Sequence, residues 1–276
     1  MQNISLLISV YVNEHAEYLT NAFQSIVDQT QPAEQVVLVC DGFLTQSLES
    51  VIEEFSPLLP LTIVRILENV GLARALNVGL SHCRNEWIAR FDSDYLCEPR
   101  RLEIQGKYIK ENIGIDVFGS SILEFAENPA QPYACRDVFA EHNEIVQYAK
   151  KRNPMNHMTV VYRKSMVLDV GGYPLDHMYE DYALWVNLIM HGCRFGNIKE
   201  PLVRARAGTE MADRRGGLRY LKAEFVVQRR FRSMGFITTG QFLYNVALRG
   251  TVRLAPSSLR RWAYATVLRK KAIANS

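Results

Sequence analysis

The chain of 276 residues lacks the features that would mark a membrane-spanning, secreted or disulfide-rich protein. No stretch reaches the roughly 18 consecutive apolar residues that a spanning helix requires. The amino-terminal residues contain no basic segment and no small-residue cleavage site, so we expect no signal peptide. The five cysteines form no Cys-x-x-Cys pair, which disfavours a disulfide framework and a structural zinc site and favours a cytosolic protein.

Several motifs of common enzyme classes are also missing. The sequence has no G-x-S-x-G, no Walker loop and no G-x-G-x-x-G, which disfavours a hydrolase elbow, a P-loop ATPase and a dinucleotide-dependent enzyme. The six histidines show no H-E-x-x-H or similar ligand spacing. With 48% hydrophobic and 22% charged residues, the composition is that of a globular protein with one large domain, or one domain with an appendage.

Acidic residues are almost absent from the carboxyl-terminal part of the chain. Residues 214–276 hold 14 lysines and arginines but a single acidic residue, Glu224, whereas the remainder holds 18 basic and 28 acidic residues. The net charge of +3 therefore combines a basic tail of +13 with an acidic body of −10. Such a tail indicates an anionic partner.

Short apolar runs alternate with helical patterns over the first 120 residues. This alternation predicts right-handed crossovers and an open, mostly parallel sheet flanked by helices, which is a Rossmann-like α/β fold. The predicted strands are 4–12, 35–40, 61–67 and 87–91, and the predicted helices are 18–27, 44–55, 71–81 and 100–112. Beyond residue 116 we expect strand pairs within 117–125, strands at 158–163 and 202–207, and helices at 141–150, 182–191, 218–232, 239–254 and 257–271.

The sequence Asp92-Ser93-Asp94 follows a predicted buried strand and is the sharpest chemical feature. The carboxyl edge of a parallel sheet is where open α/β folds bind ligands. Two carboxylates in such a loop suit a hard cation such as Mg²⁺ or Mn²⁺, which takes further oxygen ligands from water and substrate phosphates. The alternative is a solvated acidic turn or a helix cap.

Two further candidates lie near the same predicted edge. Asp41, which ends the second strand before Gly42, could accept a hydrogen bond from a ring N–H of a base, although Asp-Gly is also a common turn. Arg74 lies in a helix that begins at Gly71, where a phosphate could approach backbone N–H groups. The alternative for Arg74 is an ordinary surface arginine.

Glu180 and Asp181 precede a predicted helix and could supply a general base for a hydroxyl group. The alternative is simple capping, because acidic residues are favoured at a helix start. His157 precedes a predicted strand and could approach a metal or a diphosphate, or it could make a structural hydrogen bond.

Taken in order, these segments resemble family 2 glycosyltransferases, the inverting enzymes with the GT-A fold. The resemblance covers about residues 4–207 and is nearest to bacterial members that build O-antigen, capsule or exopolysaccharide. The segments that carry it are SVYVNE (9–14), LVCDG (38–42), NVGLARALNVGL (69–80), ARFDSDYLCEPRRLEIQ (89–105), NHMTVVYRKS (156–165) and EDYALWVNLIMHG (180–192).

The resemblance implies roles for individual residues. Asp41 matches the carboxylate that meets the uracil or other base, while Arg74 and Asn77 match positions near the donor. Asp94 matches the metal ligand, and Asp92 lies nearer the ribose or shares the metal.

On the acceptor side, Asp181 matches the catalytic base, with Glu180 as its neighbour. Two positions depart from the family pattern, Val10 in place of proline and Cys40 in place of a second acidic residue, and neither removes a proposed catalytic group. The Q-x-x-R-W motif of processive synthases is absent, which favours transfer of a single sugar.

The implied activity is metal-dependent transfer, with Mn²⁺ or Mg²⁺, from a nucleotide-diphosphate sugar, expected to be a UDP-sugar, to a hydroxyl of a lipid-linked glycan. A cation would stabilise the departing diphosphate while the base takes the acceptor proton and the configuration inverts. Arg206, Arg214 and Arg215 are candidates for a closing loop that holds the diphosphate.

We expect a glycosyltransferase domain at 1–207 and a basic loop with helices at 208–276. An apolar stripe of Phe242, Val246, Gly250 and Leu254, together with nearby arginines, could lie on an anionic leaflet at the inner face of the cytoplasmic membrane. That contact would bring the site to a polyprenyl diphosphate acceptor. The alternative is a helical cap on the core.

Two other function classes compete. A sugar-nucleotide nucleotidyltransferase would need a glycine-rich nucleotide loop near the amino terminus, and residues 10–14 offer none. A nucleic-acid-binding protein would use the basic tail with interleaved aromatic residues and bind in a salt-dependent way. The ordered set of segments favours the transferase, and we expect no nucleic-acid partner.

Overall fold

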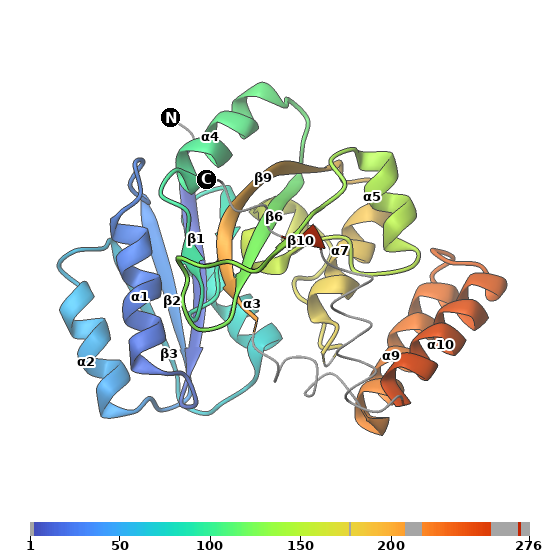
Figure 1. The fold of residues 1–276 in the computed structure, drawn as a ribbon, viewed down its shortest axis with the longest axis horizontal. Helices are drawn as coiled ribbons and strands as arrows, with labels where there is room; N and C mark the ends of the chain where they lie inside the picture. The colour runs from blue at the N-terminus through green and yellow to red at the C-terminus, as the bar shows by residue number, and fades with distance from the viewer. Residues whose placement is uncertain (1–2, 177, 208–216, 255–269, 272–276) are drawn as a thin grey trace.

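In a computed structural model, residues 3–176, 178–207, 217–254 and 270–271 are described (Figure 1). The elements to residue 111 are β1 (Ile4–Tyr11), α1 (Ala16–Val27), β2 (Gln35–Asp41), α2 (Gln46–Phe55), β3 (Leu61–Ile66), α3 (Leu72–His82), β4 (Trp87–Arg90), β5 (Leu96–Cys97) and α4 (Arg101–Glu111). The elements after it are β6 (Val117–Phe125), β7 (Ala134–Arg136), α5 (His142–Ala149), η1 (His157–Thr159), β8 (Val161–Arg163), α6 (Lys164–Asp169), α7 (Glu180–Met190), β9 (Phe195–Arg206), α9 (Leu218–Ser233), α10 (Thr239–Leu254) and β10 (Lys270–Lys271).

The strands form one sheet with a parallel half and a mixed half. Its order is β10-β7-β6-β8-β4-β1-β2-β3, with β9 beside β6 and β5 beside β9. Strands β3, β2, β1 and β4 are mutually parallel, as the alternation of strands and helices predicts. Strand β8 runs antiparallel to both β4 and β6 and joins the two halves.

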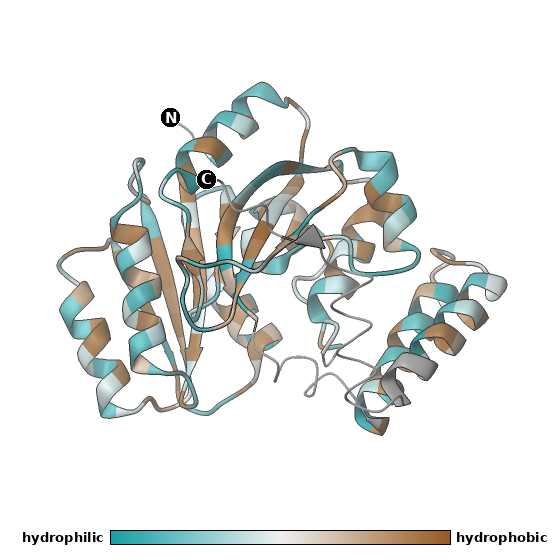
Figure 2. Ribbon diagram, in the orientation of Figure 1, coloured by the Kyte–Doolittle hydropathy of each residue, from teal (hydrophilic) through white to brown (hydrophobic). Residues whose placement is uncertain are grey.

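Both faces of the parallel half are covered by helices, because alternate residues of β1 are buried on opposite sides. One face carries α1, α2 and α4, and the other carries α3, α6 and α7. Figure 2 shows this arrangement as apolar central strands beneath helices whose outer faces are hydrophilic. The strands are therefore continuous apolar runs, which is why the sequence identifies them so clearly.

The later strands differ from their predicted form. Residues 117–125 form the single strand β6, not a pair of strands, because all nine residues pair with β9, with register shifts between Ser120 and Ile122. The predicted strand 158–163 begins as the 3-10 helix η1, and only 161–163 pair in the sheet. The short strand predicted at 202–207 is the end of the twelve-residue β9, which begins at Phe195. Periodicity misses this length because β9 is interrupted by exposed Lys199–Glu200.

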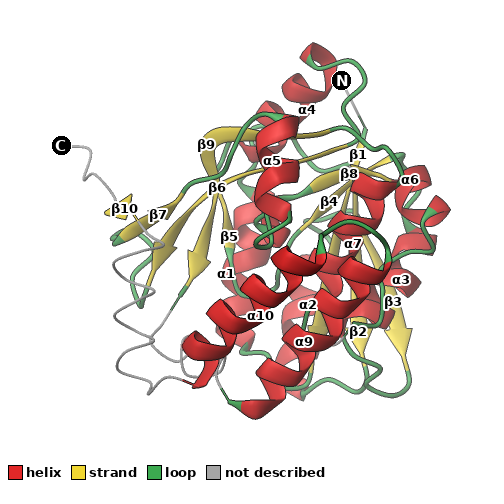
Figure 3. Cartoon of the chain, turned by 90° about the vertical axis from the view of Figure 1, so that its right-hand side faces the viewer, coloured by secondary structure: helices red, strands yellow, loops and turns green. Residues whose placement is uncertain are grey.

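Helices α9 and α10 pack on each other and on α7 and so belong to the body of the molecule (Figure 3). Phe242, from the predicted apolar stripe, is 7% exposed and stacks edge-on against Phe225, while Val246 packs on the same cluster. These two residues therefore cap the core and do not face outwards, which corrects the stripe as a membrane surface.

Of the helix predicted at 257–271, residues 257–269 lie outside the described residues, and residues 270–271 pair with β7 as the strand β10. Within the described part of the chain, no helix has both the length and the apolarity needed to cross a bilayer.

Gly79 tests how tightly α3 packs on the sheet. A Cβ atom at Gly79 would lie 2.5 Å from Leu7 Cδ1 and 2.5 Å from Val39 Cγ2. We expect Gly79→Ala to lower the free energy of unfolding by about 1–3 kcal/mol through overpacking, measured by urea denaturation. The matched change Gly240→Ala, whose nearest contact is Thr238 Oγ1 at 3.9 Å, should not destabilise the protein. Equal midpoints for the two variants would contradict the expectation.

Candidate active site

The candidate residues gather at the carboxyl edge of the parallel half of the sheet. Asp41 ends β2 and lies beside Tyr11, the last residue of β1, in the parallel register. Strand β4, two places from β2, ends at Arg90 and leads into Asp92 and Asp94. Glu14 follows β1 at the same edge and accepts a hydrogen bond from the Ser93 hydroxyl. Four carboxylates from three neighbouring strands thus share one rim.

Asp94 lies in a strongly acidic environment. Burial, followed by the negative charges of Asp92 and Glu14, raises its pKa from 3.8 to about 7, while Arg206 opposes the rise. Ionising Asp94 therefore has a substantial electrostatic cost in the folded protein. A cation placed among these carboxylates would remove that cost.

Arg90 is the cation beneath this rim. Its side chain is 1% exposed, forms an ion pair with Asp92, and donates from Nη1 to the Leu7 carbonyl at 3.3 Å. Burial lowers the pKa of His157 and the charge of Arg90 lowers it further, while at Glu180 the same charge opposes a rise in pKa that burial causes. The charge of Arg90 therefore acts on groups near both acidic motifs.

The Asp41 carboxylate organises the loop that precedes α3. It accepts hydrogen bonds from the Val70 amide at 2.7 Å, the Gly71 amide at 3.0 Å and the Asn69 side chain at 3.1 Å. Gly71 has φ of +85°, which a glycine adopts at little cost, and it caps α3. Asp41 is 3% exposed, and its Oδ1 atom, with one hydrogen bond of these three, retains capacity to accept another.

Asn77 connects α3 to the turn before α7. Its amide nitrogen donates to the Tyr173 carbonyl at 2.9 Å, and its carbonyl oxygen accepts from the Tyr173 amide at 2.7 Å. This paired contact holds residues 96 positions apart. Asn77 therefore fixes the loop, and each of its polar atoms keeps capacity for one further hydrogen bond.

A cavity of about 550 Å³ opens beside this contact. Arg74 is exposed at its wall and makes no hydrogen bond or ion pair with any described residue, so its guanidinium is available to an anion. The cavity is lined by Ile66, Val70, Arg74, Asn77, Tyr173 and Leu175, among others. A second cavity of about 610 Å³, with Trp87 and Arg163 in its wall, lies at the opposite, amino-terminal edge of β1 and β4, away from the carboxylates.

Glu180 and Asp181 form the first turn of α7. The Asp181 carboxylate accepts from the Asn153 side chain at 2.6 Å and from the Tyr182 amide at 2.7 Å. Burial, followed by the negative charge of Asp181, raises the pKa of Glu180 to about 7. A carboxyl group with such a pKa is well matched to proton transfer at neutral pH.

His157 and Tyr173 fill the space behind these carboxylates. Tyr173 is buried, which raises its pKa, and the negative charges of Asp181 and Asp92 add to the rise. His157 Nε2 lies 3.0 Å from the Tyr173 hydroxyl, and burial with nearby Arg90 holds the pKa of His157 well below its usual range. His157 is thus a half-buried residue held by a hydrogen bond, which is the structural alternative considered for it.

Arg206 approaches the rim from the end of β9. Its guanidinium lies 3.9 Å from the centre of the Tyr18 ring and 4.9 Å from that of Phe125, and its charge acts on Asp94. Its buried Nε atom has no hydrogen-bond partner among the described residues. Arg214 and Arg215, the other predicted loop arginines, lie outside the described residues.

The donor set at the rim is compatible with a divalent cation. The carboxylates of Asp92 and Asp94 are hard oxygen ligands, and the pKa of Asp94 is raised first by burial and then by the neighbouring negative charges of Asp92 and Glu14. No group of three or more His, Cys, Asp or Glu side chains in the described ranges is arranged to hold a metal ion. A cation here would therefore need further ligands from water or substrate, as Mg²⁺ usually does.

Three residues of the site were missed from the sequence. Arg90 could have been found, because an arginine inside the otherwise apolar strand Trp87–Phe91 needs an ionic partner nearby. Glu14 could also have been found, since it follows β1 at the edge where Asp41 and Asp92 were placed. Asn153 carries no such signal, because it is a loop residue whose partner is defined only by the folded chain.

Residues 5–168 match the family described as Glycosyl transferase family 2. The chain is 41% identical over 266 residues to an uncharacterized glycosyltransferase of Haemophilus influenzae, covering 96% of this chain and 99% of that protein. It is 36% identical to the amylovoran biosynthesis glycosyltransferase AmsE of Erwinia amylovora, covering 94% and 97%. It is 34% identical to the UDP-Gal:alpha-D-GlcNAc-diphosphoundecaprenol beta-1,3-galactosyltransferase of Escherichia coli, covering 96% of each chain.

Solved structures share the fold at low sequence identity. S. aureus TarS 1-349 in complex with UDP-GlcNAc is 17% identical with a TM-score of 0.68, covering 96% of this chain and 76% of that one. The mannosyltransferase PcManGT from Pyrobaculum calidifontis, in complex with GDP-Man and Mn²⁺, is 18% identical with a TM-score of 0.64, covering 96% and 75%. The fold is therefore the GT-A fold expected from the sequence, and the family match together with the full-length relatives shows that this chain belongs to glycosyl transferase family 2.

Proposed function

We propose that this glycosyltransferase is an inverting, metal-dependent enzyme that moves one sugar from a UDP-sugar to a hydroxyl of a lipid-linked glycan during assembly of a bacterial surface polysaccharide. The observation that carries the proposal is the common surroundings of the two acidic motifs. Asp92 and Asp181 both act on the buried Tyr173, and Arg90 pairs with Asp92 while acting on Glu180. These shared neighbours support a single site that combines a leaving-group region with a proton acceptor.

The relatives support the substrate class. The E. coli relative is named for a UDP-galactose donor and a GlcNAc-diphosphoundecaprenol acceptor, and it aligns with 96% of this chain. The E. amylovora relative acts in amylovoran biosynthesis. Since both alignments extend beyond residue 168 into the C-terminal helices, the likeness includes the whole site.

On the donor side, Asp41 and Arg74 are proposed to recognise the nucleotide. The remaining acceptor capacity of Asp41 Oδ1 suits a ring N–H of uracil, and Arg74 at the cavity wall suits a phosphate oxygen. Asn77 supports this surface by fixing the turn at Tyr173. Asp94, with Asp92, would hold Mn²⁺ or Mg²⁺, which supplies positive charge for the departing diphosphate.

On the acceptor side, Asp181 is proposed to take the proton of the attacking hydroxyl. The acceptor oxygen bonds to the anomeric carbon as the bond from that carbon to the diphosphate oxygen breaks, and attack from the opposite face inverts the configuration. Asn153 and the Tyr182 amide fix the direction of the Asp181 carboxylate. Glu180, with a pKa of about 7, is available to share the proton.

The outer surface of α9 and α10 is proposed to contact an anionic membrane at the cytoplasmic face. Leu243, Tyr244 and Leu248 on α10 are 60%, 61% and 51% exposed, and Phe225 and Val226 on α9 are 43% and 51% exposed. Lys222, Arg229 and Arg232 are exposed on α9 as well. Apolar side chains beside basic ones are the pattern of interfacial helices.

The base assignment predicts the behaviour of Asp181→Asn. This variant should bind UDP-sugar normally but lose about 10²–10⁴-fold in turnover, because an amide cannot accept the proton. Isothermal titration with donor and a radiolabelled transfer assay with a lipid-linked acceptor measure the two effects. The matched change Asp28→Asn, at an exposed end of α1, should retain full turnover. Normal turnover of Asp181→Asn would reject the assignment. If instead Glu180→Gln alone loses turnover by this factor, the role of the base moves to Glu180.

The metal assignment predicts a pH-dependent stabilisation. Because the pKa of Asp94 is raised from 3.8 to about 7, the folded state binds its proton more tightly than the unfolded state, so stability falls as pH rises through this range. Mn²⁺ should therefore raise the Tm more at pH 8 than at pH 6, because it binds the ionised carboxylate. In Asp94→Asn the increment at pH 8 should vanish, whereas Asp28→Asn should keep it. Equal Mn²⁺ shifts in wild type and Asp94→Asn would remove Asp94 as a ligand.

The membrane assignment predicts that α10 governs vesicle binding. Leu243→Ser with Leu248→Ser removes exposed apolar area and should reduce co-sedimentation with phosphatidylglycerol vesicles severalfold, without changing the Tm. The matched pair Leu58→Ser with Leu67→Ser, exposed at the two ends of β3, should bind vesicles like the wild type. Undiminished binding of the α10 variant would exclude this surface.

A further inference from the structure

The segment that leads into α7, described at Asp176 and at Met178–Tyr179, contains one residue with an unusual backbone conformation. Met178 has φ of +69° and is the one non-glycine residue with positive φ among the described residues. A side chain disfavours this left-handed conformation, which persists only where surrounding contacts hold it. The residues that follow directly are Glu180 and Asp181.

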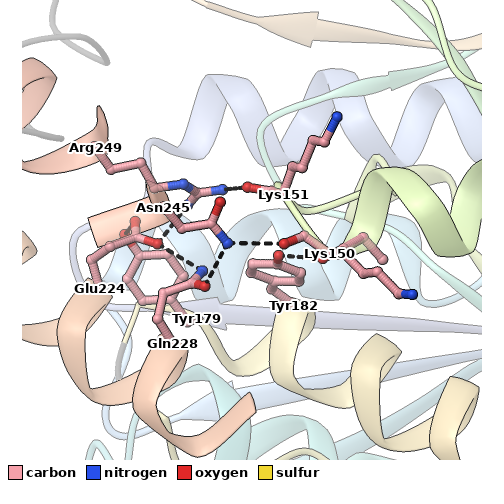
Figure 4. Close-up of polar contacts among 9 residues, drawn as sticks. Lys150, Lys151, Tyr179, Tyr182, Glu224, Gln228, Asn245 and Arg249 are labelled. Carbon is pink, nitrogen blue, oxygen red and sulfur yellow. Dashed lines mark hydrogen bonds and ion pairs between the residues drawn. The ribbon is translucent and has the colours of Figure 1, made fainter. Parts of the chain in front are cut away.

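One restraint on this segment comes from α9 through Tyr179. The Tyr179 hydroxyl donates to Glu224 Oε2 at 2.6 Å (Figure 4). Glu224 is fully buried and also accepts from Gln228 at 3.1 Å and Arg249 at 2.6 Å, so its carboxylate is fixed by both α9 and α10. The only acidic residue of the basic tail is thus used to hold the start of α7.

A second restraint acts at the other end of the segment. Arg230 of α9 forms an ion pair with Asp176 and donates to Asn187 of α7 at 3.3 Å. The strained residue Met178 therefore lies between Asp176 and Tyr179, and both of these residues are bonded to side chains of α9. This arrangement prevents the segment from relaxing independently of the helix.

Helices α9 and α10 pack together as a hairpin, here called the α9–α10 hairpin. This hairpin also holds the loop that supports Asp181 (Figure 4). Asn245 of α10 donates to the Lys150 carbonyl at 2.9 Å, and Arg249 donates to the Lys151 carbonyl. Two residues further on is Asn153, whose side chain donates to Asp181. The segment before the acidic pair and the loop that leads to Asn153 are thus both bonded to the hairpin.

We propose that the α9–α10 hairpin positions the catalytic carboxylates: Glu224 and Arg230 clamp the strained segment before α7 and so set the direction in which Glu180 and Asp181 face the acceptor. The proposal rests on the proposed function for the role of these carboxylates. Tyr179, Glu224 and Arg230 act through α7 and are positioning residues. The C-terminal helices therefore complete the catalytic domain.

The test removes each clamp singly and keeps the fold. Tyr179→Phe deletes one hydroxyl, and Arg230→Gln deletes one ion pair. The matched controls are Tyr148→Phe on α5 and Arg100→Gln, which deletes an exposed ion pair with Glu103. Hydrogen–deuterium exchange reports on peptides 178–186 and 35–41. Transfer assays yield kcat and the donor KM separately.

We expect both clamp variants to exchange faster in peptide 178–186, with peptide 35–41 unchanged, and to lose about tenfold in kcat at unchanged donor KM, because misaligned carboxylates slow proton transfer without altering the donor surface. Combining Tyr179→Phe with Met178→Gly should restore part of the lost kcat, because glycine adopts positive φ without strain. Both controls should match the wild type.

The outcomes separate this proposal from the proposed function. If the wild type transfers sugar and the clamp variants keep its kcat, the positioning proposal is wrong. If exchange in peptide 178–186 is unchanged in both clamp variants, it is wrong as well, whatever the activity. If the wild type transfers no sugar to any lipid-linked acceptor, the proposed function fails, while the exchange result still decides whether the hairpin holds the start of α7.

Discussion

A buried guanidinium beneath a ring of carboxylates is the interaction on which the site depends. Arg90 is 1% exposed inside a strand, where an unpaired charge would be strongly destabilising. Asp92 supplies its counter-ion, and its charge extends to Glu180 on α7. The arginine therefore offsets negative charge at the Asp92 loop and, more weakly, at the start of α7.

The parallel half of the fold could be predicted from the sequence because its strands are buried on both faces and appear as unbroken apolar runs. The mixed half could not be predicted as well. Residues 158–163 have the composition of a strand, yet His157–Thr159 form a 3-10 helix, in which Thr159 Oγ1 accepts a hydrogen bond from the Ser120 amide in place of strand pairing. Pairing between β6 and β9, 78 positions apart at Gly119 and Asn197, leaves no local pattern.

The sequence predicts which residues make up the candidate site better than it predicts the hydrogen-bond partners of those residues. Asp92, Asp94, Glu180 and Asp181 lie where the sequence places them, next to strand ends or at a helix start. The contacts of Asp41 and Asn77 differ in kind, because backbone groups supply their partners: two amides for Asp41 and both polar groups of Tyr173 for Asn77. A backbone partner leaves no trace in the residue types, so the motifs alone do not predict that Asp41 and Asn77 also hold loops of the folded chain.

The dependence of α7 on the last helices limits how members of this family can be divided or recombined. A chain shortened at residue 168, where the family match ends, would lose Glu180 and Asp181 altogether. One shortened at residue 207 would keep them but expose Tyr182, Val186 and Ala183, which now pack against Val227 and Phe231. A chimaera that exchanges the acceptor-binding parts of two relatives would therefore have to take α7, α9 and α10 from the same parent.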